Sequence, residues 1–481
     1  MSQAKFTQGS TMRHVAVMTL TSSAGLLALF FVDAINLFYI SLLGVTELAA
    51  AIGFAGTIQF FMISVSIGLL IAGSATVSRA IGEGDRERAR HLASSSMLTA
   101  VLALGVVAAL VWVWREDALM LLGAKDEALT EASDFLAIAL PSVPLIGIGM
   151  SCSGTLRAIG EARRAMYVTL GGGLVAAVLD PLLIFGLDLG LTGAAVAIVL
   201  TRACIAGIGL WLVVGKHDMM ARPSLPLWLA DLRPILVIAL PAMATQLSTP
   251  FGNAYLTTIV ADYGDSAVAG WAVIGRITAL AFGGIFALAG AVGPIIGQNY
   301  GAKLYPRIAS TYRDGLIFSA IYVLGAWVVL MIASRWIVSG FSLEGEGAEI
   351  VRAFTLYAAG SFVFTGALFV SNAAFNNLGR PLWSTMFNWS RDALAIPLLA
   401  FLFAPWLGPT GAVWIQAAAV LVVGTLAAMV GWRTVHRIAG HSDRPATQAV
   451  PAPAFISGRA ATGLASEAAP PDPLASGDEN R

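Results

Sequence analysis

The stretches GLLALFFVDAINLFYISLLG (25–44) and MYVTLGGGLVAAVLDPLLIFG (166–186) decide the fold of this chain. Each provides the run of about 20 mainly apolar residues that one helix needs to cross a lipid bilayer. Each contains a single acidic residue, Asp33 in the first and Asp180 in the second. A carboxylate at membrane depth costs at least about 2.5 kcal/mol, so its presence favours a proton or ion pathway. The alternative is a neutral, hydrogen-bonded Asp that ties two helices together.

The rest of the chain has the same apolar character. Of its 481 residues, 57% are hydrophobic and 12% are charged, and the mean hydropathy is +0.80. An ordinary soluble domain is about 25% charged. Runs without charge predict an all-α integral membrane protein with twelve transmembrane helices. They lie near residues 14–42, 47–79, 91–115, 129–159, 164–186, 190–214, 231–261, 266–300, 308–338, 349–378, 384–404 and 410–436.

The chain aligns with itself at an offset of about 219 residues. SRAIGEGDRERAR (78–90) aligns with GQNYGAKLYPRIA (297–309), and an offset of 220 places Asp33 on Asn253. Two such repeats predict two pseudo-symmetric six-helix bundles with a substrate path between them. The predicted parts are an N-lobe at 1–215, a cytoplasmic inter-lobe linker at 216–234, a C-lobe at 235–437 and a disordered cytoplasmic tail at 438–481.

The distribution of basic residues predicts the orientation in the membrane. If the N-terminus is cytoplasmic, the cytoplasmic segments carry 19 Lys and Arg residues, Arg391 among them, and the outer segments carry four, the tail being left out. This asymmetry follows the positive-inside rule. We therefore expect a multi-pass protein of the cell inner membrane with both termini in the cytoplasm.

Several classes of function are disfavoured. The two cysteines lie in apolar segments and are expected to be free thiols, and the formal net charge of zero gives no reason to expect a nucleic-acid partner. No pair of histidines indicates a transition-metal site, and no catalytic constellation indicates an enzyme. We expect no cofactor, a monomer, and contacts only with lipid, a small-molecule substrate and a coupling ion.

Four segments carry a resemblance to a known family: VDAINLFYISLLGVTELAAAIGFAG (32–56), RAIGEGDRERAR (79–90), LDPLLIFGLDLGLTGAAVA (179–197) and VGPIIGQNYGA (292–302). Together they resemble the multidrug and toxic compound extrusion (MATE) family, and within it a bacterial DinF-like branch. The resemblance implies a twelve-helix antiporter with two lobes around a central cleft. It also implies the export of amphiphilic, often cationic, drugs or metabolites in exchange for protons or sodium.

The resemblance also implies roles for the two buried acids. The principal coupling acid of the family's first helix falls on Asp33, and an acid of its fifth helix falls on Asp180. Ala176 and Ile198 stand where the family often has an Asn and a Thr that supply oxygen atoms to sodium. The loss of these ligands favours protons over sodium as the coupling ion. In some relatives the seventh helix carries a Glu, and here QLSTPFGN (246–253) contains no acid.

A supporting network around the acids is predicted from spacing. Asn36 lies three residues after Asp33 on the same helix face. Pro181 lacks an N–H and leaves one backbone carbonyl beside Asp180 without its helical partner. Tyr39 and Thr201 are weaker candidates. Each of these residues has an alternative role in helix packing or bending.

Polar and aromatic residues inside the spans are candidates for the substrate cleft, and each is also a candidate for helix packing. Arg202 and Arg276 are expected to be the only basic residues well inside helices, and both are expected to extend toward the inner surface. The acids of the second half, Asp392 among them, are predicted at helix ends or in loops, which places ion coupling in the N-lobe. The cleft candidates are Gln59, Phe60, Gln246, Asn253, Arg276, Asn372 and Asn376.

A second class of function stays open on the sequence. Lipid-linked precursor flippases share the broad architecture of these antiporters. A flippase is expected to carry more basic residues in its cleft and often additional helices. Two basic residues within twelve predicted helices favour the antiporter.

Overall fold

The apolar runs form helices in the computed structural model. It describes the backbone of residues 4–41 and 46–440, and the side chains of residues 4–27 and 50–440. Within these ranges the chain consists of helices and the turns that connect them. The helices belong to one compact unit, residues 1–449.

The first half supplies eight helices. Three short 3₁₀ or π segments extend or join them: η2 (Leu140–Ser142), η3 (Leu182–Gly186) and η4 (Trp211–Lys216). The helices are α1 (Thr11–Ser41), α2 (Thr46–Gly82), α3 (Arg86–Val113), α4 (Arg115–Leu121), α5 (Asp126–Ala139), α6 (Val143–Ala158), α7 (Ala162–Pro181) and α8 (Gly190–Leu210).

The second half supplies nine helices. Three short segments join them: η5 (Ala358–Ser361), η6 (Ser390–Ala395) and η7 (Gly408–Thr410). The helices are α9 (Leu225–Ala261), α10 (Asp265–Ala281), α11 (Gly283–Gly301), α12 (Tyr305–Gly340), α13 (Gly345–Leu356), α14 (Phe362–Asn377), α15 (Pro381–Trp389), α16 (Ile396–Leu407) and α17 (Gly411–Ala439).

Each predicted helix is present, although four of them are broken. The fourth is α5–η2–α6, with Pro141 in the 3₁₀ segment, because proline removes a helical hydrogen bond. The eighth is α10 and α11, which meet at an angle of 45°. The tenth and eleventh are interrupted by η5 and η6. The seventh helix, α9, begins at Leu225 rather than at 231, so the second part of the predicted linker is helical.

By length and composition, nine helical segments of the described residues are apolar enough to cross a membrane, or ten with the bent pair α10–α11. One of the nine, Pro381–Ala439, contains two predicted helices, the eleventh and the twelfth. Helix α1 is described with side chains only up to residue 27. These two points account for the difference from twelve.

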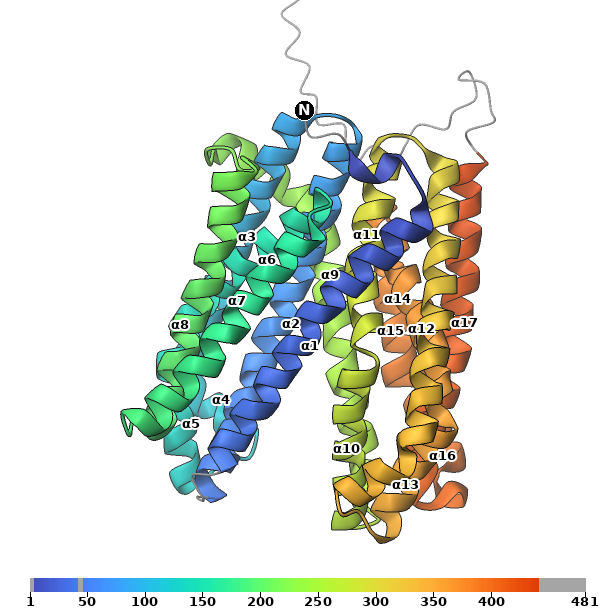
Figure 1. Ribbon diagram of the computed structural model, residues 1–481. Coiled ribbons are helices and arrows are strands. Elements are labelled where there is room, and N and C mark those ends of the chain that lie inside the picture. Colours follow the sequence, from blue (N-terminus) through green and yellow to red (C-terminus); the bar gives the residue numbers. More distant parts are fainter. Residues whose placement is uncertain (1–3, 42–45, 441–481) are drawn as a thin grey trace, which may run out of the picture. The chain divides into compact units, whose positions relative to one another are not determined.

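The two halves exchange the beginnings of their first helices. Phe6, Val15 and Met18 pack in the apolar core of the second half, and Ile235 and Ile238 pack in a core of the first half. Helix α1 runs obliquely, and it packs on α7 of its own half and on α11 and α12 of the other (Figure 1). Helix α9 packs on α2 and α3 in the same way. The halves are therefore joined by crossed helices.

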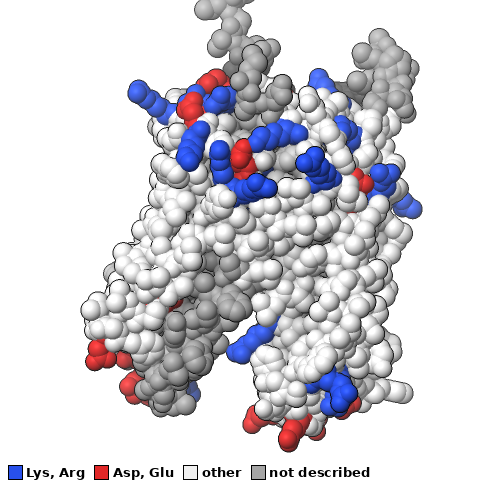
Figure 2. Space-filling view, in the orientation of Figure 1, with Lys and Arg blue, Asp and Glu red and all other residues white. Residues whose placement is uncertain are grey.

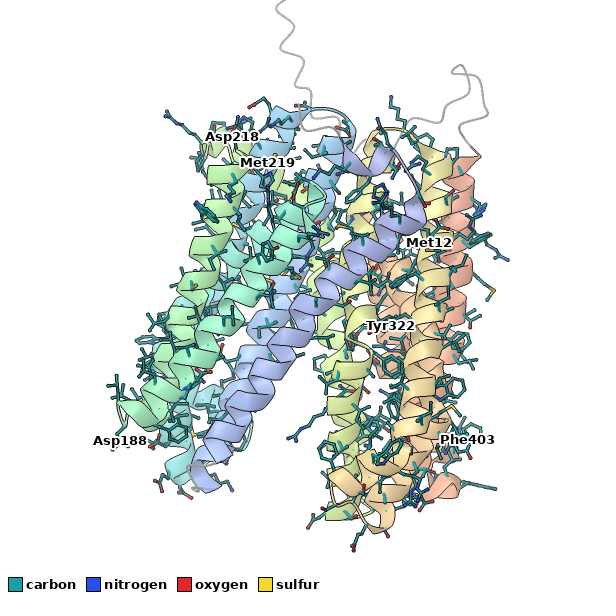
Figure 3. The ribbon with its side chains drawn as sticks, viewed as in Figure 1. Met12, Asp188, Asp218, Met219, Tyr322 and Phe403 are labelled. Atoms are coloured by element: carbon teal, nitrogen blue, oxygen red, sulfur yellow. The ribbon has the colours of Figure 1, made fainter. Side chains whose placement is uncertain are left out.

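Charged residues separate along the helix axes. Basic side chains gather at the end where the N-terminal segment lies, which we call the basic face, and acidic ones are prominent at the opposite end (Figure 2). Asp188 lies at the opposite end, whereas Asp218 lies at the basic face (Figure 3), where it pairs with Arg86 and Arg90. At the opposite end a hollow lies between the two halves (Figure 2). Basic residues at the ends of the helices include Arg86, Arg88, Arg90, Arg163, Arg164, Lys303 and Arg307.

Candidate functional site

Asp180 is buried near the end of α7, where this helix continues into the π segment η3. It is the penultimate residue of α7 and is 2% exposed. Pro181 follows it, and the chain then widens into the π segment η3, in which the N–H of Leu187 donates to the carbonyl of Leu182 at 2.9 Å. Such π segments inside helices are frequent at functional sites. The structure therefore places Asp180 beside irregular backbone, and the supporting role of Pro181 stays a prediction.

Three other predicted site residues lie on α1. The side chains of Asp33, Asn36 and Tyr39 fall outside the described residues. Helix α1 packs on α7, so positions 33 and 180 belong to neighbouring helices. The roles of Asp33, Asn36 and Tyr39 stay predictions.

Thr201 does not lie level with Asp180, the acid that it was proposed to support. Its methyl group is 3.7 Å from the point where a Cβ on Gly172 would stand, about two helical turns before Asp180. Its hydroxyl has no hydrogen-bond partner among the described residues. Thr201 therefore belongs to the contact between α7 and α8.

Arg202 does not extend to the inner surface, so that expectation was wrong. It is 8% exposed in the middle of the helical run 190–216. Its guanidinium donates to the carbonyl of Ala139 at 2.8 Å, to Ser142 Oγ at 2.7 Å and to Gln59 Oε1 at 2.7 Å. Arg202 thus fastens α8 to α2 and to the α5–α6 break. The cleft candidate Gln59 points into this network.

The cleft candidates of the second half separate into two groups. Asn372 and Asn376 are 7% and 4% exposed in a polar contact between α14 and α15. In it, Asn388 Nδ2 donates to Asn372 Oδ1 and Ser384 Oγ donates to Asn376 Oδ1, both at 3.2 Å. These two residues act as helix contacts. The candidates with partly or fully exposed side chains are Phe60, Gln246, Asn253 and Arg276.

A buried ion pair corrects two predictions for the second half. Arg391 and Asp392 lie in η6, near the middle of the helical run 381–407, and are 8% and 3% exposed. The Nε and Nη2 atoms of Arg391 each donate to one carboxylate oxygen of Asp392 at 2.7 Å. Arg391 is therefore not a cytoplasmic residue, and the second half does hold a carboxylate at membrane depth. Arg391 also adds a third basic residue inside the helices.

Two residues of α9 contact this ion pair. Thr249 Oγ1 accepts a hydrogen bond from Arg391 Nη2 at 3.2 Å. Gly252 leaves the room for the carboxylate, because a Cβ there would stand 2.8 Å from Asp392 Oδ1. With the offset of 219, Gly252 corresponds to position 33, and Arg391 and Asp392 correspond to Gly172 and Gly173. Position 33 of the first half thus carries an acid where the second half has Gly252, and the first half has no arginine at the place of Arg391.

Removing one partner of the Arg391–Asp392 ion pair is expected to destabilise the protein. Arg391→Met leaves a buried carboxylate without its counter-charge, which costs about 3–5 kcal/mol. The double variant Arg391→Met, Asp392→Leu removes both charges and is expected to be more stable than the single one. Thermal unfolding in detergent measures both, with Arg276→Gln as the control at an exposed arginine. Equal melting temperatures for Arg391→Met and the unchanged chain would contradict the ion pair.

The two halves meet at the basic face through a reciprocal contact. A Cβ on Gly82 would overlap the carbonyl of Gln298, and a Cβ on Gly301 would overlap the carbonyl of Arg79. Arg79 Nη2 donates to the carbonyl of Asn377, and Gln298 Nε2 donates to the carbonyl of Ala158, both at 2.6 Å. Gly301, Gln298 and Asn377 lie 219 positions after Gly82, Arg79 and Ala158, so the two contacts of each pair are related by the internal repeat. The basic face is therefore closed around the pseudo-twofold axis, with backbone against backbone.

Metal binding finds no support in the described part of the chain, since its His, Cys, Asp and Glu residues form no group of three or more that could hold an ion. Cys152 and Cys204 are free thiols.

Comparison with known proteins gives one family. The MatE family model matches residues 22–182 and 241–401, and the two matches begin 219 positions apart, which is the offset of the internal repeat. A protein of Shewanella oneidensis named "FAD transporter" is 27% identical over 391 residues, covering 80% of this chain and 86% of that protein. "Multidrug export protein MepA" of Staphylococcus haemolyticus is 23% identical over 442 residues, covering 90% and 96%.

Solved structures agree on the fold. An outward-facing multidrug resistance MATE family transporter superposes with a TM-score of 0.84 at 21% identity, covering 90% of this chain and 98% of that one. A MOP superfamily transporter from Pyrococcus furiosus superposes with a TM-score of 0.82 at 22% identity, with the same coverage. The two-lobed, twelve-helix arrangement predicted from the sequence is thus confirmed.

Proposed function

Because the chain belongs to the MatE family of membrane transporters, we propose that it is a secondary antiporter that exports amphiphilic organic compounds in exchange for protons. The proposal rests on one observation. Asp180 is 2% exposed on α7, beside Pro181 and the π segment η3, in an otherwise apolar run. A carboxylate buried in a membrane span favours a proton or ion pathway, and a second acid on the neighbouring helix α1 would let the two share and release a proton. Asp33 is proposed as that second acid.

The basic face is proposed to be the cytoplasmic one. Its excess of Lys and Arg supports this orientation in the inner membrane, with both termini inside. The hollow at the opposite end would then open to the outside. We further propose that the protein works as a monomer in contact with lipid, with the N-lobe at 1–215, the linker at 216–234 and the C-lobe at 235–437.

Protons are favoured over sodium by the surroundings of Asp180. A hard cation takes several oxygen ligands. Ile198, on the neighbouring helix α8, packs against an apolar core cluster and offers none. Ala176, one turn before the acid, also offers none. The side-chain oxygens available to a sodium ion near Asp180 are therefore fewer than the family resemblance implies for sodium-coupled members.

Transport in proteoliposomes tests the coupling ion. With ethidium as the cationic probe, a pH gradient is expected to drive its movement, and a sodium gradient with the pH clamped on both sides is expected to leave it at the level of protein-free vesicles. Fluorescence of ethidium on DNA inside the vesicles measures the flux. Sodium-driven movement at clamped pH would show that the proton proposal is wrong.

An anionic substrate is a second candidate, supported by Arg276. This residue lies on α10 inside the bent span 265–301 and is exposed, and the described part of the chain offers it no ion pair or hydrogen bond. An exposed cation at membrane depth suits an anionic group, and the relative from Shewanella oneidensis is named an FAD transporter. The same vesicles supplied with FAD instead of ethidium separate the two candidates. The names of both relatives favour a small molecule over the lipid-linked precursor of a flippase.

A further inference from the structure

The segment before α1 lies across the closed basic face. Residues 4–11 include the short helix η1 (Lys5–Thr7), and Phe6 is 2% exposed. The N–H of Phe6 donates to Gln298 Oε1 at 3.0 Å, and its carbonyl accepts from Asn299 Nδ2 at 3.2 Å. Both partners lie on α11 and are fully buried. The segment therefore covers polar groups of the second half that would otherwise be exposed at the junction.

An arginine of α12 fastens the same segment to the second half. Arg307 donates to the carbonyl of Phe6 at 3.0 Å, to that of Gln8 at 3.2 Å and to that of Gly9 at 3.0 Å. Thr11 Oγ1 donates to the carboxylate of Asp314 on the same helix. Five backbone and side-chain groups of residues 6–11 thus have their partners on α11 and α12.

The other side of the segment contacts the first half. Lys5 forms an ion pair with Glu161 in the turn between α6 and α7. Gly160 in this turn has φ of +81°, and a Cβ there would stand 3.2 Å from Cζ of Phe6. The amide of Gln298, which receives the N–H of Phe6, also donates to the carbonyl of Ala158. One buried amide therefore joins the segment to both halves.

Glu161 remains ionised at neutral pH. Its partial burial raises the pKa of the carboxyl, but the hydrogen bond and charge of Lys5 and the charges of Arg164 and His217 outweigh this and hold the pKa below its ordinary value. The ion pair with Lys5 is consequently present at the pH of a cytoplasm.

The internal repeat relates residues 4–11 to the start of α9, and the two segments are held in different ways. Arg307 and Asp314 correspond to Arg88 and Ser95 of the first half. Those residues hold the start of α9, because Arg88 pairs with Asp231 and Ser95 Oγ donates to its carboxylate at 2.7 Å. The start of α9 is also tied covalently to the first half through the linker. Residues 4–11 have no such covalent tie to the second half and depend on their contacts.

We propose that residues 4–11 form a latch that holds the basic face closed and must leave the turn 158–161 before the two halves separate there. Lys5 and Phe6 of the latch contact this turn of the first half. Residues 6–11 of the latch contact α11 and α12 of the second half. Opening the face pulls these two sides apart, so the contacts of the latch add to the free energy of opening. This inference requires neither a particular cargo nor a particular coupling ion.

Distances across the basic face test the latch. The full chain carries a ketone-bearing amino acid in place of Arg163 and Arg380, two exposed positions on opposite halves. Dyes on these ketones report the separation by single-molecule energy transfer in lipid nanodiscs. Phe6→Ala is expected to raise the ratio of open to closed molecules about tenfold, from the loss of one buried aromatic side chain. Arg13→Gln, which removes an exposed charge on α1 next to the latch, is expected to leave the ratio unchanged.

A cross-link provides the second arm of the test. In the Phe6→Ala chain with Cys152→Ala and Cys204→Ala, the substitutions Lys5→Cys and Glu161→Cys are joined by a short bis-methanethiosulfonate reagent. The link is expected to return the open fraction to the level of the unmodified chain, and a reducing agent is expected to raise it again. Lys5→Gln, at a half-exposed side chain, is expected to raise the ratio about twofold and serves if Phe6→Ala does not fold. A ratio unchanged in these variants, or a face that opens despite the link, would overturn the proposal.

Discussion

Asp33→Asn is expected to abolish export driven by a pH gradient while leaving the protein folded and inserted. The substitution keeps the size and the hydrogen-bonding groups of the side chain, and it removes the proton that the side chain would bind and release. With the offset of 220, the second half carries Asn253 at the matching site of the repeat. The initial rate of ethidium movement in proteoliposomes measures the effect.

The control for this experiment is an acid at the same end of the molecule. Asp188→Asn changes an exposed carboxylate in the turn between η3 and α8 and is expected to keep the unmodified rate. Gel filtration and thermal unfolding of both variants show whether they are folded. Rates for Asp33→Asn equal to those of the unmodified chain would end the proposal that Asp33 carries the coupling proton.

Asp180→Asn is expected to lower pH-driven export strongly, and the double variant with Asp33→Asn is expected to be no slower than the slower single variant. Two acids that share a proton titrate as a pair, so the loss of either one disrupts the same unit. Independent sites would instead give effects that multiply in the double variant. Transport rates of the three variants under one gradient decide between these outcomes.

Asp180 is buried beside Pro181, so a structural role makes a different prediction for it. If the carboxylate only stabilises the helix break, Asp180→Asn should keep proton-driven export and lower the melting temperature. Retained export together with a loss of stability would leave Asp33 as the sole coupling acid and would make Asp180 a packing residue.

The sequence predicted the helices well because charges are costly in lipid and therefore mark the ends of spans. It did not predict the 45° bend between α10 and α11, which lies inside an apolar run with no charge to mark it. The break at η2 was also missed, although Pro141 is a signal for it. The repeat aligned Gly82 with Gly301, but an alignment shows that two positions are equivalent and not that they touch. Their reciprocal packing depends on where the axis between the halves passes, which only the structure provides.

The site was predicted unevenly for a related reason. Asp180 was found because it stands alone in an apolar run, and its burial agrees with that prediction. Arg391 and Asp392 were missed because two adjacent opposite charges resemble the polar end of a helix. Their signal was the continuation of apolar residues on both sides, from Pro381 to Leu407. Hydropathy alone also gave no means to tell the inward-pointing Gln59 from the exposed Phe60 beside it.

The Arg391–Asp392 pair has an electrical consequence. Its two charges are held together and sum to zero, so a movement of the second half through the membrane potential carries no charge on this pair. The voltage dependence of the transport cycle would then come from the cargo, from the acids of the first half and from the charges of Arg202 and Arg276, which form no such pair among the described residues. Moving one elementary charge through 100 mV changes the free energy by about 2.3 kcal/mol. Exchange of one monovalent cation for one proton would therefore be indifferent to voltage, whereas exchange of a neutral compound for one proton would be driven by it.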